Sequence, residues 1–516
     1  MTASFRRALL IGAGVVALAV LVAGLSPHLI PTGDQATFVL LGRSLAAGEG
    51  YADTFRPDAP PHTKFPPLLP LLVAPFASGA LATQDFLACQ AIVLALGLLG
   101  AFFAYKLFRP GGAGVALLVS ALFLFNARYY VTSHTLMSEV PFITASLGAL
   151  LALRSAAKEE RILSRPALLA ALALSAATLA RTVGIVLALS GALFLILGVE
   201  SRGPLAFRLR KAAAVAFLPV ATLAAWLVRN NVVAGRATEY LSQIGAANPE
   251  AAEAGALTAM GFADRLWNGF KDYFFQTGDL LYLGDQIRGL GVAAETAELF
   301  VLAIAIACIV AAYIPLLISG RGPVELWVFF YVGAIVVYPY RNYRYALPLL
   351  PFFLHYLYIG LGRLVAPARW KTAFRAAALG GIGLVNALAI GVFLTEGDRH
   401  DFGAHRIAGV PAADFYRKGY GELFRAAGYA RENLPADAVV FTDKPEYFAA
   451  WSGRKTVPYP GTIDPGNIVA DALARGAGYL LSDNLTNRDL AKRRDLLEKD
   501  FAEVWRDGGT VLWKRR

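Results

Sequence analysis

Long apolar runs separated by short basic clusters constrain the fold of this chain more than any other feature. Of its 516 residues, 57% are hydrophobic and only 16% are charged, whereas soluble domains contain about a quarter charged residues. A bilayer core about 30 Å thick is crossed by about 20 apolar residues in helical conformation. The sequence therefore predicts a polytopic membrane protein whose transmembrane part is all α-helical.

About eleven runs fit this length and are expected to be transmembrane helices. The first follows Phe5 and two arginines, and it resembles a signal peptide. Because no small-residue cleavage pattern precedes a polar chain, we expect an uncleaved first helix. The break between the fifth and sixth runs is placed at Arg181. The predicted spans are 8–28, 84–107, 113–129, 138–155, 166–181, 183–199, 212–229, 297–318, 324–340, 345–363 and 375–395.

The distribution of positive charge predicts the orientation. With a cytoplasmic N-terminus, nearly every inner connection is basic, as the positive-inside rule requires. The net charge of +11 is therefore explained by topology, and we expect no nucleic-acid partner. The high content of Ala, Gly and Arg favours a GC-rich bacterium, and we expect the bacterial cytoplasmic membrane. The inner basic residues include Lys106, Arg109, Arg154, Lys158, Arg161, Arg165, Arg202, Arg208, Arg210, Lys211, Arg321, Arg363, Arg369, Lys371 and Arg375.

This topology predicts two domains. Residues 1–395 form a transmembrane domain with an outer loop, 30–83, and an amphipathic outer segment, 230–296. Residues 396–516 have frequent charges and short alternating runs, which predict a small soluble α/β domain on the outer face. Its expected strands are 438–442, 479–482 and 510–514, and its expected helices are 420–432 and 488–499.

The first outer loop carries an acidic residue next to the membrane. Asp34 follows the first span, and apolar residues at helical spacing after it predict an amphipathic helix, Gln35–Ala47, in the interface. Asp34 could cap this helix, or its carboxylate could be fixed at the membrane surface for chemistry. The two roles are compatible.

A lysine and a histidine lie further along the same loop. Lys64 precedes Pro66 and Pro67, which mark the start of another helix. Lys64 could contact a phosphate at the lipid–water boundary, or it could be an ordinary interfacial lysine. His62 is a candidate metal ligand, although a single histidine in a Pro-rich loop is more often solvated. Cys89 and Cys308 lie in apolar runs and have no metal-ligand spacing.

Asp34, the Gly-x-Gly-Tyr sequence at 48–51 and the Lys-Phe-Pro-Pro sequence at 64–67 together resemble the GT-C superfamily of membrane glycosyltransferases. The resemblance is to the branch that contains protein O-mannosyltransferases and lipid A aminoarabinose transferases. There are departures. Thr63 stands where several relatives have an acidic residue, which weakens any metal site carried over from them. The first loop has no acidic pair, and the tail has no WWD-type motif.

The resemblance implies transfer of a sugar from a polyprenyl-phosphate donor to an acceptor hydroxyl at the outer leaflet, with inversion. It implies that Asp34 is the general base. Lys64, Arg341, Arg344 and Tyr345 would bind the donor phosphate. The two arginines could instead be anchors in a belt of aromatic residues.

Two further residues match positions of the family. Glu139, at the start of the fourth span, could bind the acceptor or a divalent metal ion, or it could cap its helix. Arg181 is expected to brace the loops near the site rather than to contact substrate.

Two other classes of function compete with a transferase. A transporter or flippase of a lipid-linked sugar would have ionisable residues in the middle of its spans and broken helices in two corresponding halves. The charges here lie near the outer ends of the spans instead. A non-catalytic scaffold would leave Asp34, Lys64 and Arg344 without a role. The acceptor, a lipid or a glycan, and the sugar are not identified by the sequence.

Overall fold

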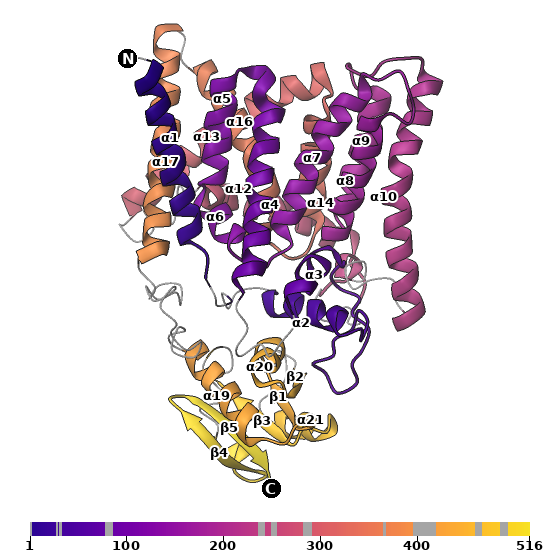
Figure 1. Ribbon diagram of the computed structural model, residues 1–516, viewed down its shortest axis with the longest axis vertical. Helices are drawn as coiled ribbons and strands as arrows, with labels where there is room; N and C mark the ends of the chain where they lie inside the picture. The colour runs from indigo at the N-terminus through magenta and orange to yellow at the C-terminus, as the bar shows by residue number, and fades with distance from the viewer. Residues whose placement is uncertain are drawn as a thin grey trace.

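The protein consists of a bundle of long helices with a small α/β domain at one end (Figure 1). The computed structural model describes residues 3–26, 29, 34–77, 86–235, 243–248, 255–281, 292–364, 368–395, 419–459, 467–483, 485 and 494–516. The N-terminus lies at the end of the bundle away from the α/β domain. The predicted domain boundary at 395/396 and the segment up to residue 418 lie outside the described residues.

The helices confirm the predicted membrane fold. Six helical segments in the described residues are long and apolar enough to cross a membrane, and a seventh is the pair α5–α6, which bends by 64°. Four shorter apolar helices belong to α1, α8, α9 and α14, so the count of eleven spans stays a prediction. The bundle helices are α1 (Ala3–Ala23), α4 (Leu87–Phe108), α5 (Ala113–Leu124), α6 (Ala127–Ser133), α7 (Glu139–Ala157), α8 (Arg165–Ala180), α9 (Gly184–Leu197), α10 (Leu205–Ala234), α12 (Ala259–Leu281), α13 (Val292–Gly320), α14 (Pro323–Val337), α15 (Tyr343–Ala346), α16 (Leu350–Leu364) and α17 (Ala368–Thr395).

The predicted break at Arg181 is confirmed, and the close packing there explains it. Helix α8 ends at Ala180 and α9 begins at Gly184. A Cβ atom on Gly184 would lie 2.5 Å from the backbone of Ala177. Only glycine allows the two helices to approach so closely at this turn.

The first outer loop forms a compact layer under the bundle. Helix α2 (Gln35–Ala46) packs against α3 (Leu68–Val73) and the 3-10 turn η1 (Ala74–Phe76). Pro67 is the N-cap of α3, so the prediction of a helix entry at the two prolines is confirmed. The helix predicted at Gln35–Ala47 is confirmed, and its position in the membrane interface stays a prediction. Most of α2 is buried, because it packs against α3, η1 and α20 of the α/β domain.

The α/β domain has a five-stranded sheet in the order β2-β1-β3-β5-β4. Strands β1 (Val439–Thr442), β2 (Lys455–Pro458) and β3 (Tyr479–Ser482) are parallel, whereas β5 (Thr510–Arg515) runs antiparallel to β3 and to β4 (Phe501–Asp507). The helices are α19 (Gly419–Asn433), α20 (Pro445–Ser452), α21 (Ile468–Ala474) and α23 (Arg494–Leu497).

The three strands expected in the tail and the helix at 420–432 are confirmed. The helix expected at 488–499 is described only from residue 494, where it is one turn long. Strand β4 was missed because charged residues interrupt its alternation. The two glycines after Asp507 could have indicated a hairpin turn, and therefore a strand before it. Gly508 has a φ of +54° and sits in the two-residue turn that joins β4 to β5, where such backbone is required.

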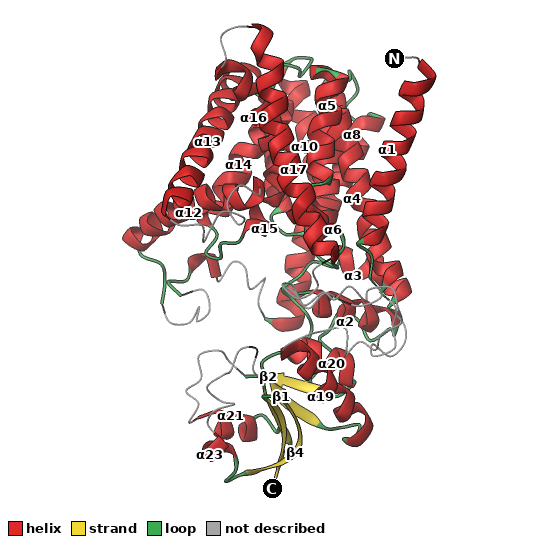
Figure 2. Ribbon diagram, turned by 90° about the vertical axis from the view of Figure 1, so that its left-hand side faces the viewer, coloured by secondary structure: helices red, strands yellow, loops and turns green. Residues whose placement is uncertain are grey.

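The α/β domain lies next to the first outer loop, with α20 beside α2 (Figure 2). The edge strand β2 donates a hydrogen bond from Thr456 N–H to the Phe55 carbonyl at 2.9 Å. Lys455 Nζ donates to the Thr54 carbonyl. Helix α20 packs on α2, and Trp451 lies 6.5 Å from Phe86 between ring centroids. The apolar core of the bundle therefore continues into α19 and α20.

Candidate active site

A cavity of about 1210 Å³ lies between the bundle helices and the first outer loop. Its walls come mainly from α9, α10 and α14, and they are largely apolar. Asp34, Lys64 and Arg344 line the same cavity, together with Arg181 and Tyr345. The structure therefore brings together five of the eight residues selected from the sequence. The apolar lining includes Ile185, Val186, Leu189, Leu223, Leu227, Val328 and Ile335.

Asp34 occupies the N-cap position of α2 but does not act as a cap. Its side chain makes no capping hydrogen bond. The carboxylate instead lies 3.9 Å from the Arg344 guanidinium, and 38% of the side chain is exposed. The start of α2 is fixed by the next residue, since the Gln35 side-chain oxygen accepts a hydrogen bond from Leu136 N–H at 2.8 Å. The Asp34 carboxylate is therefore free of a capping role and can contact a molecule in the cavity.

One buried glutamate holds two arginines at the cavity. Glu139, the first residue of α7, is 0% exposed, and its Oε1 lies 2.7 Å from Arg181 and 2.8 Å from Arg344. Asn342 caps the short helix α15 by accepting a hydrogen bond from Arg344 N–H at 3.0 Å, which helps to direct the arginine. A buried ion pair of this kind orients its members at the expense of desolvating them.

Glu139 itself is not among the described residues that line the cavity. The expectation that it meets the acceptor or a metal ion does not fit a carboxylate enclosed by two guanidinium groups. Its position instead allows it to orient the side chains of Arg181 and Arg344. Arg181 has the bracing contact that was expected and also lines the cavity. Its guanidinium lies 5.3 Å from the centre of the Tyr345 ring.

Lys64 adds a third cation. Its Nζ lies 4.9 Å from the centre of the Phe65 ring, and it forms no ion pair in the described part of the chain. Three cations therefore face two carboxylates, Asp34 and Glu139. This surplus of positive charge at the end of an apolar cavity suits a phosphate group.

The sequence analysis missed the contacts that hold the Lys64 loop. Near the end of α10, Arg229 donates to the carbonyls of His62 and Tyr51, the latter at 2.8 Å. Asn230 donates to the Thr63 carbonyl at 3.2 Å. An arginine and an asparagine at the outer end of an apolar span are the signal that could have indicated this role.

Arg341 is not among the described residues that line the cavity, so the structure does not support its predicted contact with a donor phosphate. It pairs with Asp272 at 2.9 Å and donates to the Arg265 carbonyl at 3.1 Å, both on α12. Arg341 precedes the short helix α15, whereas Arg344 is within the helix. Their side chains therefore point to different neighbours despite their close spacing.

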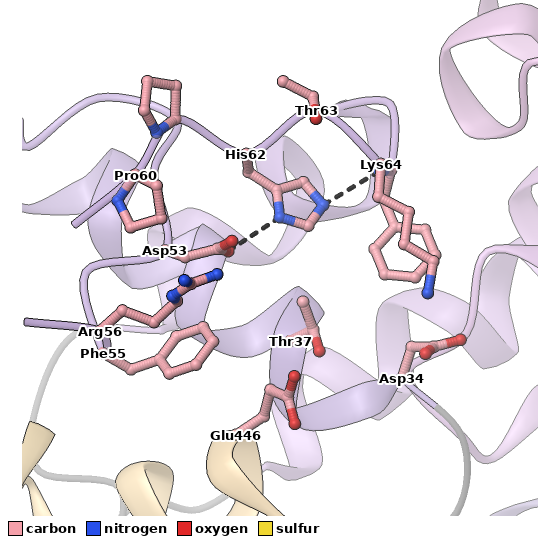
Figure 3. A pocket seen from close by; sticks show the side chains of 12 residues that line it. Asp34, Thr37, Asp53, Phe55, Arg56, Pro60, His62, Thr63, Lys64 and Glu446 are labelled. Atoms are coloured by element: carbon pink, nitrogen blue, oxygen red, sulfur yellow. Dashed lines mark hydrogen bonds and ion pairs between the residues drawn. The ribbon is translucent and has the colours of Figure 1, made fainter. Parts of the chain in front are cut away.

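His62 does not fit the role of metal ligand. It is 6% exposed. Its Nε2 accepts a hydrogen bond from Phe65 N–H at 3.0 Å, so its Nδ1 carries the proton that bonds Asp53 at 2.8 Å (Figure 3). Both ring nitrogens are thus engaged. In the described residues, no group of three or more His, Cys, Asp and Glu side chains could hold a metal ion.

A second, smaller pocket of about 180 Å³ adjoins the cavity. Asp34, Lys64 and Phe65 line both spaces, so they form the boundary between them. The other walls are mostly polar and include Glu446, which extends from the first turn of α20 (Figure 3). Burial, followed by the nearby carboxylates of Asp34 and Asp53, raises the pKa of Glu446. The sequence analysis did not select this residue.

Comparison with solved structures identifies the fold. ArnT from Cupriavidus metallidurans bound to undecaprenyl phosphate is 15% identical, with a TM-score of 0.58 over 99% of this chain and 98% of that one. The Archaeoglobus fulgidus oligosaccharyltransferase in complex with Zn and sulfate is 15% identical, with a TM-score of 0.56 over 91% of this chain and 67% of that one. No family model and no curated protein sequence matches the chain. The predicted resemblance is confirmed at the level of structure: this chain has the fold of the GT-C glycosyltransferases.

Proposed function

We propose that the protein is a glycosyltransferase that moves a sugar from a polyprenyl-phosphate donor to an acceptor hydroxyl at the outer face of a bacterial cytoplasmic membrane. One observation carries this proposal. A carboxylate, Asp34, and three cations meet at the end of a cavity of about 1210 Å³ with largely apolar walls. The apolar walls would bind the isoprenoid chain of the donor, and the cations would bind its phosphate.

Two solved structures with this fold support a lipid-phosphate ligand. The first is ArnT bound to undecaprenyl phosphate. The second is AglB from Archaeoglobus fulgidus in complex with an inhibitory peptide and a dolichol-phosphate; it is 12% identical, with a TM-score of 0.53 over 93% of this chain and 70% of that one. A polyprenyl chain cannot leave the bilayer, which explains why a transferase for such a donor is built from membrane helices.

The orientation is supported by the ends of α7. Glu139 begins this helix at the cavity, while Arg154 and Lys158 lie at its other end and pair with Glu200. The basic connection is thus at the opposite end of the bundle from the α/β domain and the first outer loop. By the positive-inside rule, this distribution of charge supports an outer position for the cavity mouth and the α/β domain.

In the proposed reaction, the acceptor oxygen attacks the anomeric carbon of the donor sugar. Asp34 takes the proton from the acceptor hydroxyl as the new C–O bond forms. The bond between the sugar and the phosphate oxygen breaks, and its electron pair leaves with the polyprenyl phosphate. Lys64, Arg344 and Arg181 stabilise the negative charge that develops on this leaving group. A single displacement inverts the anomeric carbon.

The resemblance also implied a divalent cation, but the residues suggested for one do not fit. His62 uses both ring nitrogens, and Glu139 is enclosed by Arg181 and Arg344. The Zn in the oligosaccharyltransferase complex is therefore not carried over. The reaction described above uses only the side chains of this chain.

The experiment is complementation of cells that lack the gene. Such cells should accumulate a polyprenyl-phosphate sugar and contain an under-modified glycan or lipid, both detected by mass spectrometry. Wild-type protein should remove the accumulated lipid. Asp34→Asn should lower transfer by about 10²- to 10⁴-fold without reducing the amount of protein in the membrane.

The matched control is Asp272→Asn, which makes the same change on α12 next to Arg341, outside the group at the cavity. It should retain transfer. Normal transfer by Asp34→Asn would remove Asp34 from the role of base. If the lost activity were movement of the intact lipid-linked sugar between leaflets, the alternative of a flippase would replace the transferase.

A further inference from the structure

The small pocket beside Asp34 differs in chemistry from the large cavity. The cavity is mostly apolar, whereas the pocket is lined by Thr37, Asp53, Arg56, Thr63 and Glu446 in addition to the shared residues. A lipid chain suits the first space and not the second. A molecule in the pocket would meet Asp34 from the side opposite the apolar cavity.

The pocket is built jointly by the first outer loop and the α/β domain. Glu446 is in the first turn of α20, which packs on α2. Strand β2 follows α20 and bonds the loop at Thr54 and Phe55. Phe55 also lines the pocket. The α/β domain is therefore held in a fixed register against the loop, and Glu446 is directed into the space rather than to bulk solvent.

The charges in the pocket favour an uncharged ligand. Three carboxylates line it: Asp34, Asp53 and Glu446. Of the basic residues, Arg56 lies 3.6 Å from Asp58, and His62 is a neutral donor to Asp53. Lys64 stands at the boundary with the cavity, where the proposed donor phosphate would be. A phosphorylated or carboxylated group in the pocket would meet three carboxyl groups, against one arginine already paired with Asp58 and one lysine at the boundary.

Resting on the proposed function, we propose that this pocket binds the acceptor and that the accepting group is an uncharged, polyhydroxylated one such as a sugar ring of a glycan. Glu446 and Asp53 accept hydrogen bonds from its hydroxyl groups. The attacking hydroxyl lies at the boundary, where Asp34 receives its proton. The α/β domain thereby contributes a residue that selects the acceptor. Burial of Glu446 strengthens any hydrogen bond that it makes there.

The test measures binding to the purified full-length protein by saturation-transfer difference NMR. The probes are a set of neutral methyl glycosides and the corresponding glycoside 6-phosphates. Neutral glycosides should bind about tenfold or more tightly than their phosphates. Glu446→Ala should weaken glycoside binding by about tenfold or more, the usual effect of losing a hydrogen bond to a charged group. Glu446→Gln, which keeps one acceptor oxygen, should show a smaller loss.

Glu432→Ala is the matched control, because Glu432 is an exposed glutamate on α19; it should leave glycoside binding unchanged. Binding of undecaprenyl phosphate is measured in parallel and should be the same for wild type and Glu446→Ala, which shows that the variant is folded. Tighter binding of the phosphates, no glycoside binding by the wild type, or unchanged glycoside binding by Glu446→Ala would each overturn the inference. Failure of the wild type to bind undecaprenyl phosphate would count against the proposed function instead.

Discussion

The large cavity and the small pocket meet at Asp34 and Lys64 but are built in different ways. The cavity is walled mainly by bundle helices, and its two arginines are held by Glu139 inside the bundle. The pocket is walled by a loop and by a separate domain that bonds this loop through an edge strand. A binding site for a donor that related enzymes share can be built from rigid helices. A binding site for an acceptor that differs between related enzymes is more readily built from loops, which vary more in sequence. In the proposed enzyme, donor and acceptor recognition are thus placed on separate parts of the chain.

The largest effect on transfer is expected from comparing Arg344 with Arg341, both of which were predicted to bind the donor phosphate. Arg344→Ala should lower transfer by about 10²- to 10³-fold, because it removes a cation from the developing phosphate charge. Arg341→Ala should leave transfer within about threefold of wild type, because Arg341 contacts α12 and not the cavity. Initial rates of transfer in membranes, normalised to protein amount, provide the measurement. Equal losses for the two variants would contradict the assignment of Arg344 to the donor side.

A smaller effect, on ligand binding, is expected from replacing Arg229, which holds the Lys64 loop. Arg229→Ala should weaken binding of undecaprenyl phosphate by about tenfold, because the carbonyls of His62 and Tyr51 lose their donor and Lys64 is no longer fixed. Arg229→Lys should recover part of this affinity, since it retains one cationic donor. Because the same loop also borders the pocket, glycoside binding should fall as well. Affinity for both ligands equal to wild type would show that the loop is positioned without Arg229.

The smallest effect is expected for Glu446→Gln, which should change the stability of the folded protein in a pH-dependent way. A raised pKa means that the folded protein disfavours the ionised carboxylate, whose neighbours are Asp34, Asp53 and Lys64. The wild type should therefore lose stability relative to Glu446→Gln as the pH rises through the pKa of the folded state, and the two should converge below the ordinary carboxylate range. The difference at neutral pH should be about 0.5 kcal/mol or less. Thermal melting of the two proteins across this pH range is the measurement, and a more stable wild type at neutral pH would contradict the expected sign.

Much of the fold could be predicted because membrane helices leave strong local signals. Apolar length marked the long helices, and the break at Arg181 was found from the sequence. The strands of the α/β domain were harder. Alternation revealed β1, β3 and β5, but β2 has four residues, and β4 is rich in charge. Such strands are stabilised by pairing with neighbouring strands, and a short segment of sequence does not show this pairing.

The candidate site shows the same limit at the level of single residues. Asp34, Lys64 and Arg344 were selected from motifs, and the structure places them in one cavity. Their assigned roles stay proposals. Arg341 was also selected, but it lies before α15 begins and pairs with Asp272 on α12. His62 was selected for its chemistry, but its ring is fully used by Asp53 and the backbone of Phe65.

The sequence by itself determined the membrane helices and indicated the GT-C fold and a carboxylate just before α2, since apolar length and local motifs are properties of short segments. The tertiary structure alone decided that Glu139 orients two arginines, that Arg229 holds the Lys64 loop, and that Glu446 comes from a distant domain to complete a pocket. These contacts join residues 42 to 412 positions apart. The physical reason is that such partners are chosen by packing in three dimensions, and packing leaves no periodic signal in the chain.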